Sequence, residues 1–369
     1  MIRILVFGMT ENPGGVESFL INYYRLLNGK ELCFDFLCNS YEKTAYEDEL
    51  INNGSRCFHI VSRSKNPLKY TKELNELFKM HSVEWDAVWV NVSSLANIDY
   101  LKIAKKYNIK RRIIHSHNSR NMDGFLRGVL HKHNRRVLGK YATDYWACSR
   151  LAAEWFYDSK LMKKVVIIRN AIDVERMAFN QEERKTIRET HNWFNKTVLG
   201  NVGRLHFQKN HLFMVDVFAE YHKHNASSVL VLVGTGEDEA KIKSRIESYG
   251  ISDSVYFAGL QSNIRAWLSS FDLFLFPSLF EGLSVAAMEA QANGVPTLAS
   301  EGVIPEEVKI NDNFKFYSLE KTAYEWSEQI DPLIEMGRAN SHTILESFQN
   351  EGFDIYKAAD ELHILLLGL

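Results

Sequence analysis

The chain of 369 residues is long enough for two domains, at roughly 100–200 residues per domain. Its 46% hydrophobic and 24% charged residues are typical of a globular protein, and its net charge of −2 excludes a global attraction to nucleic acid or to an anionic membrane. The cysteines lack CxxC spacing, which predicts buried thiols in a reducing cytoplasm rather than a metal site: Cys33, Cys38, Cys57 and Cys148.

The first apolar segment, residues 2–7, is too short for a signal peptide and predicts a buried strand. A turn at Asn12-Pro13-Gly14-Gly15 follows, and residues 16–27 have apolar residues at helical spacing. A strand, a glycine loop and a helix N-terminus can bind an anion through free backbone N–H groups. No run approaches the roughly 20 apolar residues of a transmembrane helix, so we expect a soluble or peripheral protein.

Strand and helix patterns then alternate through the first half of the chain. This alternation predicts a parallel sheet with helices on both faces and with ligands at the carboxyl ends of the strands. His115-Ser116-His117-Asn118 falls at such a strand end, and a histidine there could donate to a phosphate and change charge near neutral pH. The expected strands are 34–38, 56–60, 87–92 and 112–115, and the expected helices are 70–80 and 98–107.

Residues 119–140 form a basic segment with apolar residues interleaved. It contains a single acid, Asp123. One interpretation is an amphipathic helix that lies on an anionic membrane or binds a diphosphate-linked lipid. The other is a solvated helix with its apolar side in the core. The basic residues are Arg120, Arg127, Lys132, Arg135, Arg136 and Lys140.

The next segments lead into a second α/β half. Strands are expected over 144–149 and 165–168, and the polar residues 175–196 predict a linker helix. A strand over 198–202 is followed by Gly203-Arg204 and, five residues on, by Lys209. Two further strands end in glycine turns, 229–233 before Gly234-Thr235-Gly236 and 255–258 before Gly259-Leu260, with a helix over 239–249 between them.

Residues 271–300 combine a strand, a polar loop and a helix. The apolar run 273–276 stops at Pro277, Gly282 allows close approach to a ligand, and Ser284 can cap a helix that ends before Gly294. Such a helix N-terminus favours phosphate. Glu281 and Glu289 lie eight residues apart, which in a helix is about 80° around the axis and about 12 Å along it. That span suits a ligand with a sugar at one end and a nucleoside at the other.

Glu281-x7-Glu289, with Pro277 and Ser278 before it and Gly294-Val295-Pro296 after it, resembles the paired-glutamate motif of the retaining GT-B glycosyltransferases of glycosyltransferase family 4. The resemblance implies an α/β fold of two doubly wound Rossmann-like domains that face each other across a cleft. Residues 1–170 would bind the acceptor and 171–349 the nucleotide sugar, with a helix over about 350–369 crossing back to the first domain. Ile168-Arg169-Asn170-Ala171-Ile172-Asp173 is similar to the family's interdomain hinge, with alanine where glycine is usual.

The resemblance also implies roles for individual residues. Arg204 and Lys209 match a diphosphate clamp, which would stabilise the charge that grows on the leaving phosphate. Glu281 would bind the donor sugar, Glu289 the ribose, and Gly282, Leu283 and Ser284 would offer N–H groups to phosphate. Gly15 would lie near the diphosphate, Glu17 or Ser18 near the acceptor, Gly259 and Leu260 near the base, and His117, or less well His115, near the donor sugar. Asp-x-Asp is absent, so no metal and no cofactor is expected.

The expected reaction is transfer of a hexose from a nucleotide diphosphate sugar, preferably a UDP-sugar, to a hydroxyl with retention. The first-half motifs resemble members that build bacterial capsule or exopolysaccharide, which implies a lipid diphosphate-linked acceptor and a cytoplasmic enzyme, soluble or peripheral at the inner membrane face. Two alternatives are a nucleotide-sugar epimerase of the same fold and a non-catalytic carbohydrate-binding protein on a dead transferase fold. A nicotinamide dehydrogenase fits poorly because the first loop lacks GxGxxG.

Overall fold

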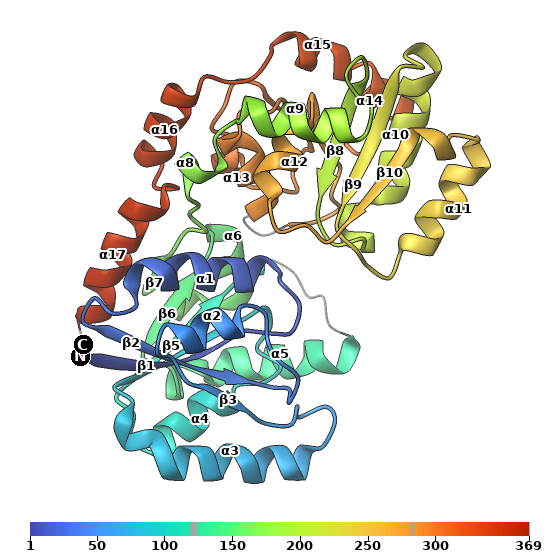
Figure 1. Cartoon of the computed structure of the whole chain (residues 1–369). Helices are drawn as coiled ribbons and strands as arrows, with labels where there is room; N and C mark the ends of the chain where they lie inside the picture. Colours follow the sequence, from blue (N-terminus) through green and yellow to red (C-terminus); the bar gives the residue numbers. More distant parts are fainter. Residues whose placement is uncertain (119–123, 282–283, 369) are drawn as a thin grey trace. The chain divides into compact units, whose positions relative to one another are not determined.

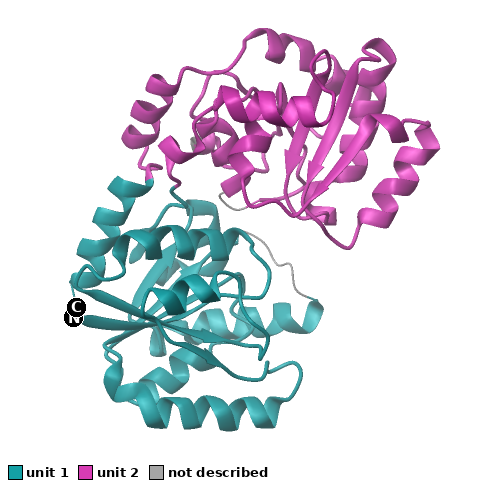
Figure 2. Cartoon of the chain, in the orientation of Figure 1, with its two compact units in different colours: residues 1–171, 355–369 teal, residues 172–354 magenta. Residues whose placement is uncertain are grey.

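The computed structural model of the chain describes residues 1–118, 124–281 and 284–368 (Figure 1). The chain forms two compact units, and each is built around one parallel sheet (Figure 2). The first unit comprises residues 1–171 and 355–369, and the second comprises residues 172–354. The sequence predicts this boundary at 170/171 and the return to the first unit at about residue 350.

The first unit contains a seven-stranded sheet in the order β3-β2-β1-β4-β5-β6-β7. Neighbouring strands are parallel throughout. The strand order reverses direction between β1 and β4, which is where ligands bind in doubly wound folds. The strands are β1 (Ile2–Phe7), β2 (Leu32–Cys38), β3 (Cys57–His59), β4 (Ala87–Val92), β5 (Arg111–Ser116), β6 (Asp144–Ala147) and β7 (Val165–Ile167).

Helices cover both faces of this sheet, as the alternating pattern predicts. One face packs against α1, α2 and α17, and the other against α3, α4 and α6. The helices are α1 (Gly15–Leu27), α2 (Glu47–Asn52), α3 (Pro67–His81), α4 (Asp99–Lys106), α5 (Phe125–Val137), α6 (Arg150–Phe156), α7 (Ser159–Met162) and α17 (Ile355–Leu367), with short 3-10 turns η1 (Ser82–Glu84) and η2 (Leu138–Lys140).

The second unit contains a six-stranded parallel sheet in the order β10-β9-β8-β11-β12-β13. Its order reverses between β8 and β11. The strands are β8 (Thr197–Val202), β9 (Ser228–Val233), β10 (Val255–Gly259), β11 (Leu273–Phe276), β12 (Thr297–Ser300) and β13 (Phe314–Tyr317).

Two helical layers again cover the sheet, and the four residues of β11 are completely buried, as expected for a strand between two layers. Helices α8, α12, α13 and α16 pack on one face, and α10, α11, α14 and α15 on the other. Their bounds, with α9 and the 3-10 turns, are α8 (Val174–Met177), α9 (Gln181–Thr190), η3 (Phe207–Lys209), α10 (His211–His224), α11 (Glu239–Tyr249), η4 (Ser252–Ser254), α12 (Ile264–Ser270), α13 (Val285–Ala292), η5 (Glu306–Val308), α14 (Ala323–Ser327), α15 (Ile330–Glu335) and α16 (Ser341–Asn350).

Several expected elements differ from the structure. The segment 175–196 is not a linker: α9 packs on α12, and its Arg184 and Arg188 each donate to Asp272 at 2.6 Å. The last helix begins at Ile355 rather than at about residue 350, because the chain leaves α16 through Gly352 at φ 73° and restarts as α17.

Two smaller predictions are also wrong. The strand expected over 144–149 stops at Ala147, because Ser149 caps α6. Only two of the four free thiols are buried, Cys38 and Cys148, whereas Cys33 and Cys57 are partly exposed.

Candidate functional site

The loops at the carboxyl ends of β8 and β9 lie backbone to backbone. Leu205 N–H donates to Thr235 O at 3.0 Å, and Asp238 N–H donates to Leu205 O at 3.0 Å. Gly234 has φ +134°, and a Cβ there would stand 2.1 Å from the carbonyl oxygen of Gly203. A Cβ on Gly236 would stand 2.2 Å from the oxygen of Leu205. Glycine is therefore required at both positions, and the two loops form one rigid floor.

Arg204 extends from this floor and is 71% exposed. Its guanidinium lies 3.0 Å from one carboxylate oxygen of Glu237, and His206 Nε2 lies 3.4 Å from the other. Because His206 Nδ1 accepts from the Gln208 N–H at 3.3 Å, a neutral His206 carries its proton on Nε2, facing Glu237. Glu237 thus holds both side chains, and its own pKa is lowered first by a backbone hydrogen bond and then by these two neighbours.

Lys209 and Glu281 form a mostly buried ion pair between the loops that follow β8 and β11. Lys209 Nζ lies 2.8 Å from Glu281 Oε1, and the two side chains are 14% and 6% exposed. The ammonium group also lies 4.7 Å from the centre of the Phe276 ring. Gln208 donates to the carbonyl of Phe280 at 3.0 Å and approaches Glu281 Oε2 at 3.4 Å. Residues 208, 209 and 281 therefore meet at the point where the strand order reverses.

The helix that follows this loop, α13, begins where the motif predicts. Ser284 is its N-cap and accepts from Ala287 N–H, but Gly282 and Leu283 lie outside the described residues. Glu289 is half-buried on α13. Burial raises the pKa of Glu289 to about 7, while the charge of Arg176 opposes the rise. This carboxyl group is thus poised to change charge near neutral pH.

The turn after β10 joins the same floor. Gly234 N–H donates to Gly259 O at 2.8 Å, and Gly259 has φ +66° with open space around its Cα. Leu260 is 69% exposed. These predicted base-binding residues therefore lie beside the loops that carry Arg204 and Lys209.

In the first unit, the predicted glycine loop leads directly into α1. Gly14 is the N-cap and Gly15 the first helical residue, with open space where a Cβ would point. Glu17 is 6% exposed: Thr10 Oγ1 donates to its Oε1 at 2.6 Å, and burial raises its pKa. Glu17 therefore braces the glycine loop from within, and the position of Glu17 or Ser18 near the acceptor, which the resemblance implies, stays a prediction.

The two candidate histidines occupy different environments. His115 is completely buried among aromatic rings, with Phe19 at 5.1 Å, Trp89 at 6.1 Å and Trp146 at 6.1 Å between ring centroids. His117 lies at the end of β5, and its Nε2 is 2.9 Å from Asn91 Oδ1. Since the Asn91 amide nitrogen donates to Phe7 O, its oxygen accepts and His117 Nε2–H donates.

Burial lowers the pKa of His117 to about 3, so this histidine is neutral near pH 7. The expectation that it changes charge near neutral pH is therefore wrong. Asn91, which orients His117, was missed by sequence reasoning, as were Gln208 and Glu237. A signal existed for Asn91, because it is the one polar residue in the strand Ala87–Val92.

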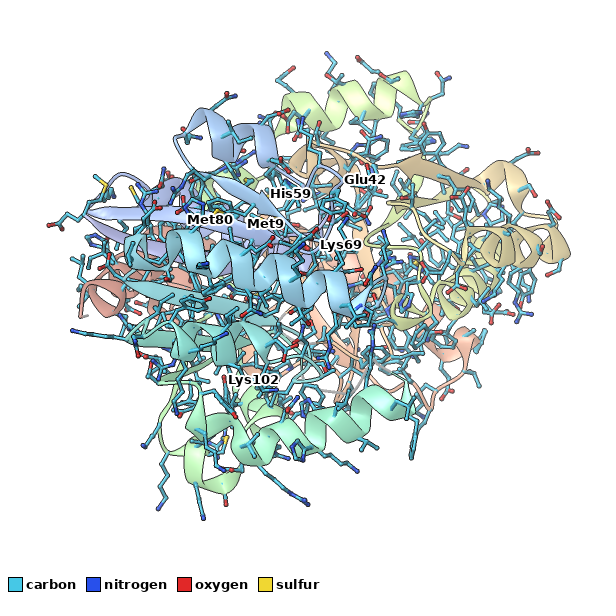
Figure 3. The ribbon with its side chains drawn as sticks, turned by 90° about the horizontal axis from the view of Figure 1, so that it is seen from below. Met9, Glu42, His59, Lys69, Met80 and Lys102 are labelled. Atoms are coloured by element: carbon cyan, nitrogen blue, oxygen red, sulfur yellow. The ribbon has the colours of Figure 1, made fainter. Side chains whose placement is uncertain are left out.

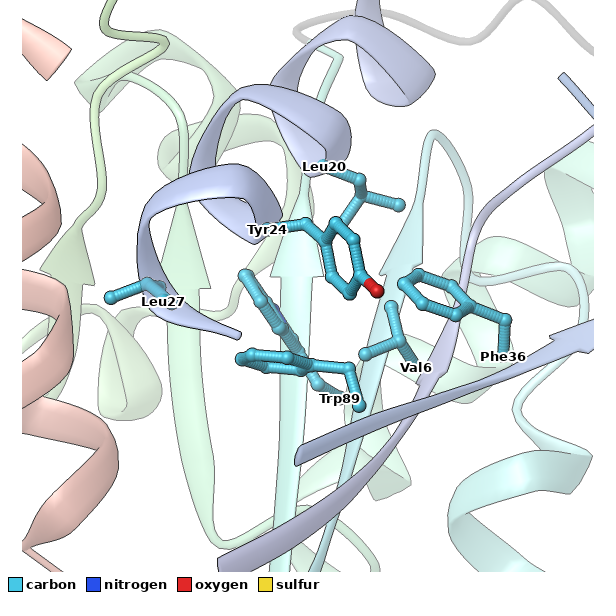
Figure 4. A pocket seen from close by; sticks show the side chains of 7 residues that line it. Val6, Leu20, Tyr24, Leu27, Phe36 and Trp89 are labelled. Atoms are coloured by element: carbon cyan, nitrogen blue, oxygen red, sulfur yellow. The ribbon is translucent and has the colours of Figure 1, made fainter. Parts of the chain in front are cut away.

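Two hollows lie in the first unit, away from these loops. One of about 10 Å³ lies in the core among Val6, Tyr24, Phe36 and Trp89 (Figure 4) and is no larger than a water molecule. A hollow of about 300 Å³ lies between α3 and α4, on the side shown in Figure 3, where Lys102 is labelled. Within the described ranges, no three His, Cys, Asp or Glu side chains gather as metal ligands would, and no helix is long and apolar enough to cross a membrane.

Comparison with known proteins finds a family similarity in the second unit. Residues 183–347 match the family model of glycosyl transferases group 1. The second unit is thus similar to a group 1 glycosyltransferase domain. The matched residues carry the Arg204, Lys209, Glu281 and Glu289 constellation described above.

Relatives extend this similarity to nearly the whole chain. The putative glycosyltransferase EpsF of Bacillus subtilis is 28% identical over 93% of this chain and 90% of its own. The capsular polysaccharide biosynthesis glycosyltransferase CapH of Staphylococcus aureus is 25% identical over 90% and 91%. The structure of HepE of Anabaena in complex with UDP-glucose superposes with a TM-score of 0.82 at 17% identity, covering 100% of both chains. The chain therefore has the GT-B fold, as predicted from the sequence.

Proposed function

We propose that this chain is a retaining glycosyltransferase of family 4. It transfers a hexose from a nucleotide diphosphate sugar, a UDP-sugar by preference, to a hydroxyl of a glycan or lipid diphosphate-linked sugar in bacterial polysaccharide synthesis. The observation that carries the proposal is the Lys209–Glu281 pair at 2.8 Å, formed where β8 and β11 end, beside the loop that bears Arg204. A cation and a carboxylate at this edge are what a phosphate-linked sugar requires.

The charges explain how a donor would be activated. When the bond between the anomeric carbon and the β-phosphate oxygen breaks, negative charge grows on that phosphate, and fixed cations lower the barrier. Lys209 has three N–H donors and gives one to Glu281, so two remain for phosphate oxygens. Arg204 is exposed and its guanidinium has five N–H groups to share between Glu237 and a ligand. We expect these two cations to act without a metal ion and without a cofactor.

The remaining residues would position the donor and the acceptor. Glu281 would accept hydrogen bonds from the sugar hydroxyls, and Glu289 from the ribose hydroxyls. The N-terminus of α13, at Ser284 and the preceding Gly282 and Leu283, would bind phosphate through N–H groups. In a front-face reaction the acceptor oxygen bonds to the anomeric carbon on the side that the phosphate leaves, and the acceptor proton passes to the leaving phosphate. The configuration at the anomeric carbon is therefore retained.

Similarity to known proteins supports a UDP-sugar as donor and polysaccharide biosynthesis as the pathway. HepE binds UDP-glucose on the same fold, and CapH acts in capsular polysaccharide biosynthesis. Both favour a UDP-sugar donor and a polysaccharide acceptor for this chain. A lipid-linked acceptor would place the enzyme at the cytoplasmic face of the membrane.

The proposal is tested with a panel of UDP-, GDP- and ADP-sugars in the presence of EDTA. We expect one donor to raise the melting temperature of the protein and to release nucleotide slowly by hydrolysis. Arg204→Ala and Glu281→Ala should abolish release, whereas Arg245→Ala, which removes an exposed arginine paired with Asp216 at 2.7 Å, should not. Binding and turnover that survive in Arg204→Ala and Glu281→Ala, or a strict requirement for a divalent cation, would contradict the proposal.

A further inference from the structure

Helix α5 is inverted with respect to an ordinary surface helix. Its buried residues are polar, His131 and Asn134. Its large apolar residues face solvent instead: Phe125 is 85% exposed, Leu126 77%, Val129 50% and Leu130 42%. Of the two interpretations of this segment, the core-facing one holds for Val137 and Leu138 but not for these four residues. Exposed apolar groups that gather on one element mark a site of interaction.

Polar contacts fix the helix in this orientation. His131 Nδ1 accepts from the Leu95 N–H at 3.1 Å, and Asn134 donates to the Leu95 carbonyl at 2.6 Å. The His131 ring also stacks on Trp155, with centroids 4.1 Å apart. Arg135 donates to the carbonyls of Glu154 and Tyr157. Turning the apolar residues toward the core would break all of these hydrogen bonds.

The exposed face changes character along its length. At 100° per residue, the four apolar side chains span about 140° of the helix circumference. Lys132, His133 and Arg136 are exposed and fall in or beside the same arc, one to two turns further on. Residues 124–140 contain five lysines and arginines and no aspartate or glutamate, in a chain of net charge −2. The face is thus apolar at its N-terminal end and cationic at its C-terminal end.

We propose that this face of α5 docks on the surface of an anionic lipid bilayer. The apolar residues Phe125, Leu126, Val129 and Leu130 enter the boundary between headgroups and acyl chains, and Lys132 and Arg136 lie at the lipid phosphates. Positive charge without any acid is complementary to such a surface. A stable protein interface needs about 800 Å² from each partner, which is more than four side chains of one helix supply.

The proposal does not depend on the reaction proposed above. Docking is measured by flotation of the purified full chain with vesicles of phosphatidylcholine alone or with added phosphatidylglycerol. We expect binding to the anionic vesicles and little to the neutral ones. Phe125→Ser/Leu126→Ser and Lys132→Glu/Arg136→Glu should each weaken binding about tenfold or more.

Matched variants control for general effects of surface change. Leu68→Ser/Val83→Ser removes apolar side chains that are 86% and 94% exposed in the same unit. Lys65→Glu/Lys79→Glu reverses two exposed lysines at and before α3, the helix that carries Lys69 and Met80 in Figure 3. Both controls should bind vesicles like the unaltered protein, and all variants should keep its melting temperature and its donor hydrolysis in vesicle-free solution.

Three outcomes would overturn the proposal. The first is equal binding to neutral and anionic vesicles, or none to either. The second is an equal loss of binding in the control variants. The third is a dimer in solution that the Phe125→Ser/Leu126→Ser change dissolves, since the occupant of the face would then be a second copy of this chain.

Discussion

Replacing Lys209 by methionine removes the cation of the buried pair and keeps most of the side-chain volume. Breaking a buried ion pair by removing one partner costs about 3–5 kcal/mol. Gln208 still approaches the Glu281 carboxylate at 3.4 Å and Lys209 is 14% exposed, so we expect about 3 kcal/mol. At about 2–4 °C per kcal/mol for a unit of this size, the melting temperature of the second unit falls by about 6–12 °C.

The double variant Lys209→Met/Glu281→Gln separates stability from chemistry. A neutral amide at position 281 needs no cation, so the double variant should recover most of the lost stability, with a coupling free energy of about 2 kcal/mol. It should not recover turnover, because the cation that faces the leaving phosphate is still absent. We expect both variants to release nucleotide about 10²–10³ times more slowly than the unaltered enzyme.

The two readouts are thermal unfolding by circular dichroism and nucleotide release from the donor found in the panel. A coupling free energy near zero would refute the ion pair as a structural element. Nucleotide release in the double variant at the rate of the unaltered enzyme would refute Lys209 as the cation that stabilises the leaving group.

Three further outcomes are expected. Burial raises the pKa of Glu289 from 4.5 to about 7, so the native state binds this proton more tightly than the unfolded state does. The free energy of unfolding should therefore fall as the pH rises from about 4.5 to 7. Glu289→Gln should flatten that pH dependence in urea titrations. Burial lowers the pKa of His117 from 6.5 to about 3, so the free energy of unfolding should fall as the pH drops below about 6.5. His117→Asn should reduce this loss of stability in acid, as measured by the same urea titrations. Gly234→Ala should unfold the loops after β8 and β9 or abolish donor binding, since its Cβ would stand 2.1 Å from a carbonyl oxygen. Gly259→Ala, with φ +66° and open space for a Cβ, should lower the free energy of unfolding in denaturant by only about 1 kcal/mol. Equal effects of the two substitutions would contradict the close packing of the two loops.

The doubly wound architecture could be predicted from the sequence because it depends on patterns within short segments of the chain. A buried parallel strand is an apolar run, as in Leu273–Phe276. The residues that follow it indicate a turn at Pro277 and a helix cap at Ser284. The spacing of the four charged site residues is also visible in the sequence and allowed the family resemblance to be recognised: Arg204, Lys209, Glu281 and Glu289. The structure adds that Lys209 and Glu281, 72 residues apart, are in direct contact.

What the sequence did not reveal depends on contacts between distant segments. The bond between Asn91 and His117 joins the ends of β4 and β5, and the pairing of Arg204 with Glu237 joins the ends of β8 and β9. Helix α5 is the clearest example, because its periodic apolar residues look like an ordinary core-facing stripe. The anchoring of His131 and Asn134 to Leu95, which joins distant segments, helps determine which side faces outward.

The return of the chain to the first unit has a consequence for its synthesis. Helix α17 packs against α1 and contributes Ile355, Ala358, Ala359, Leu362 and Leu366 to the core that also holds β1 and β2. A ribosome makes α17 only after all of residues 172–354, so the first unit emerges with this part of its core open to solvent. The second unit, which is continuous in sequence, can fold while the first still waits for its last helix. The segment translated first is thus completed last.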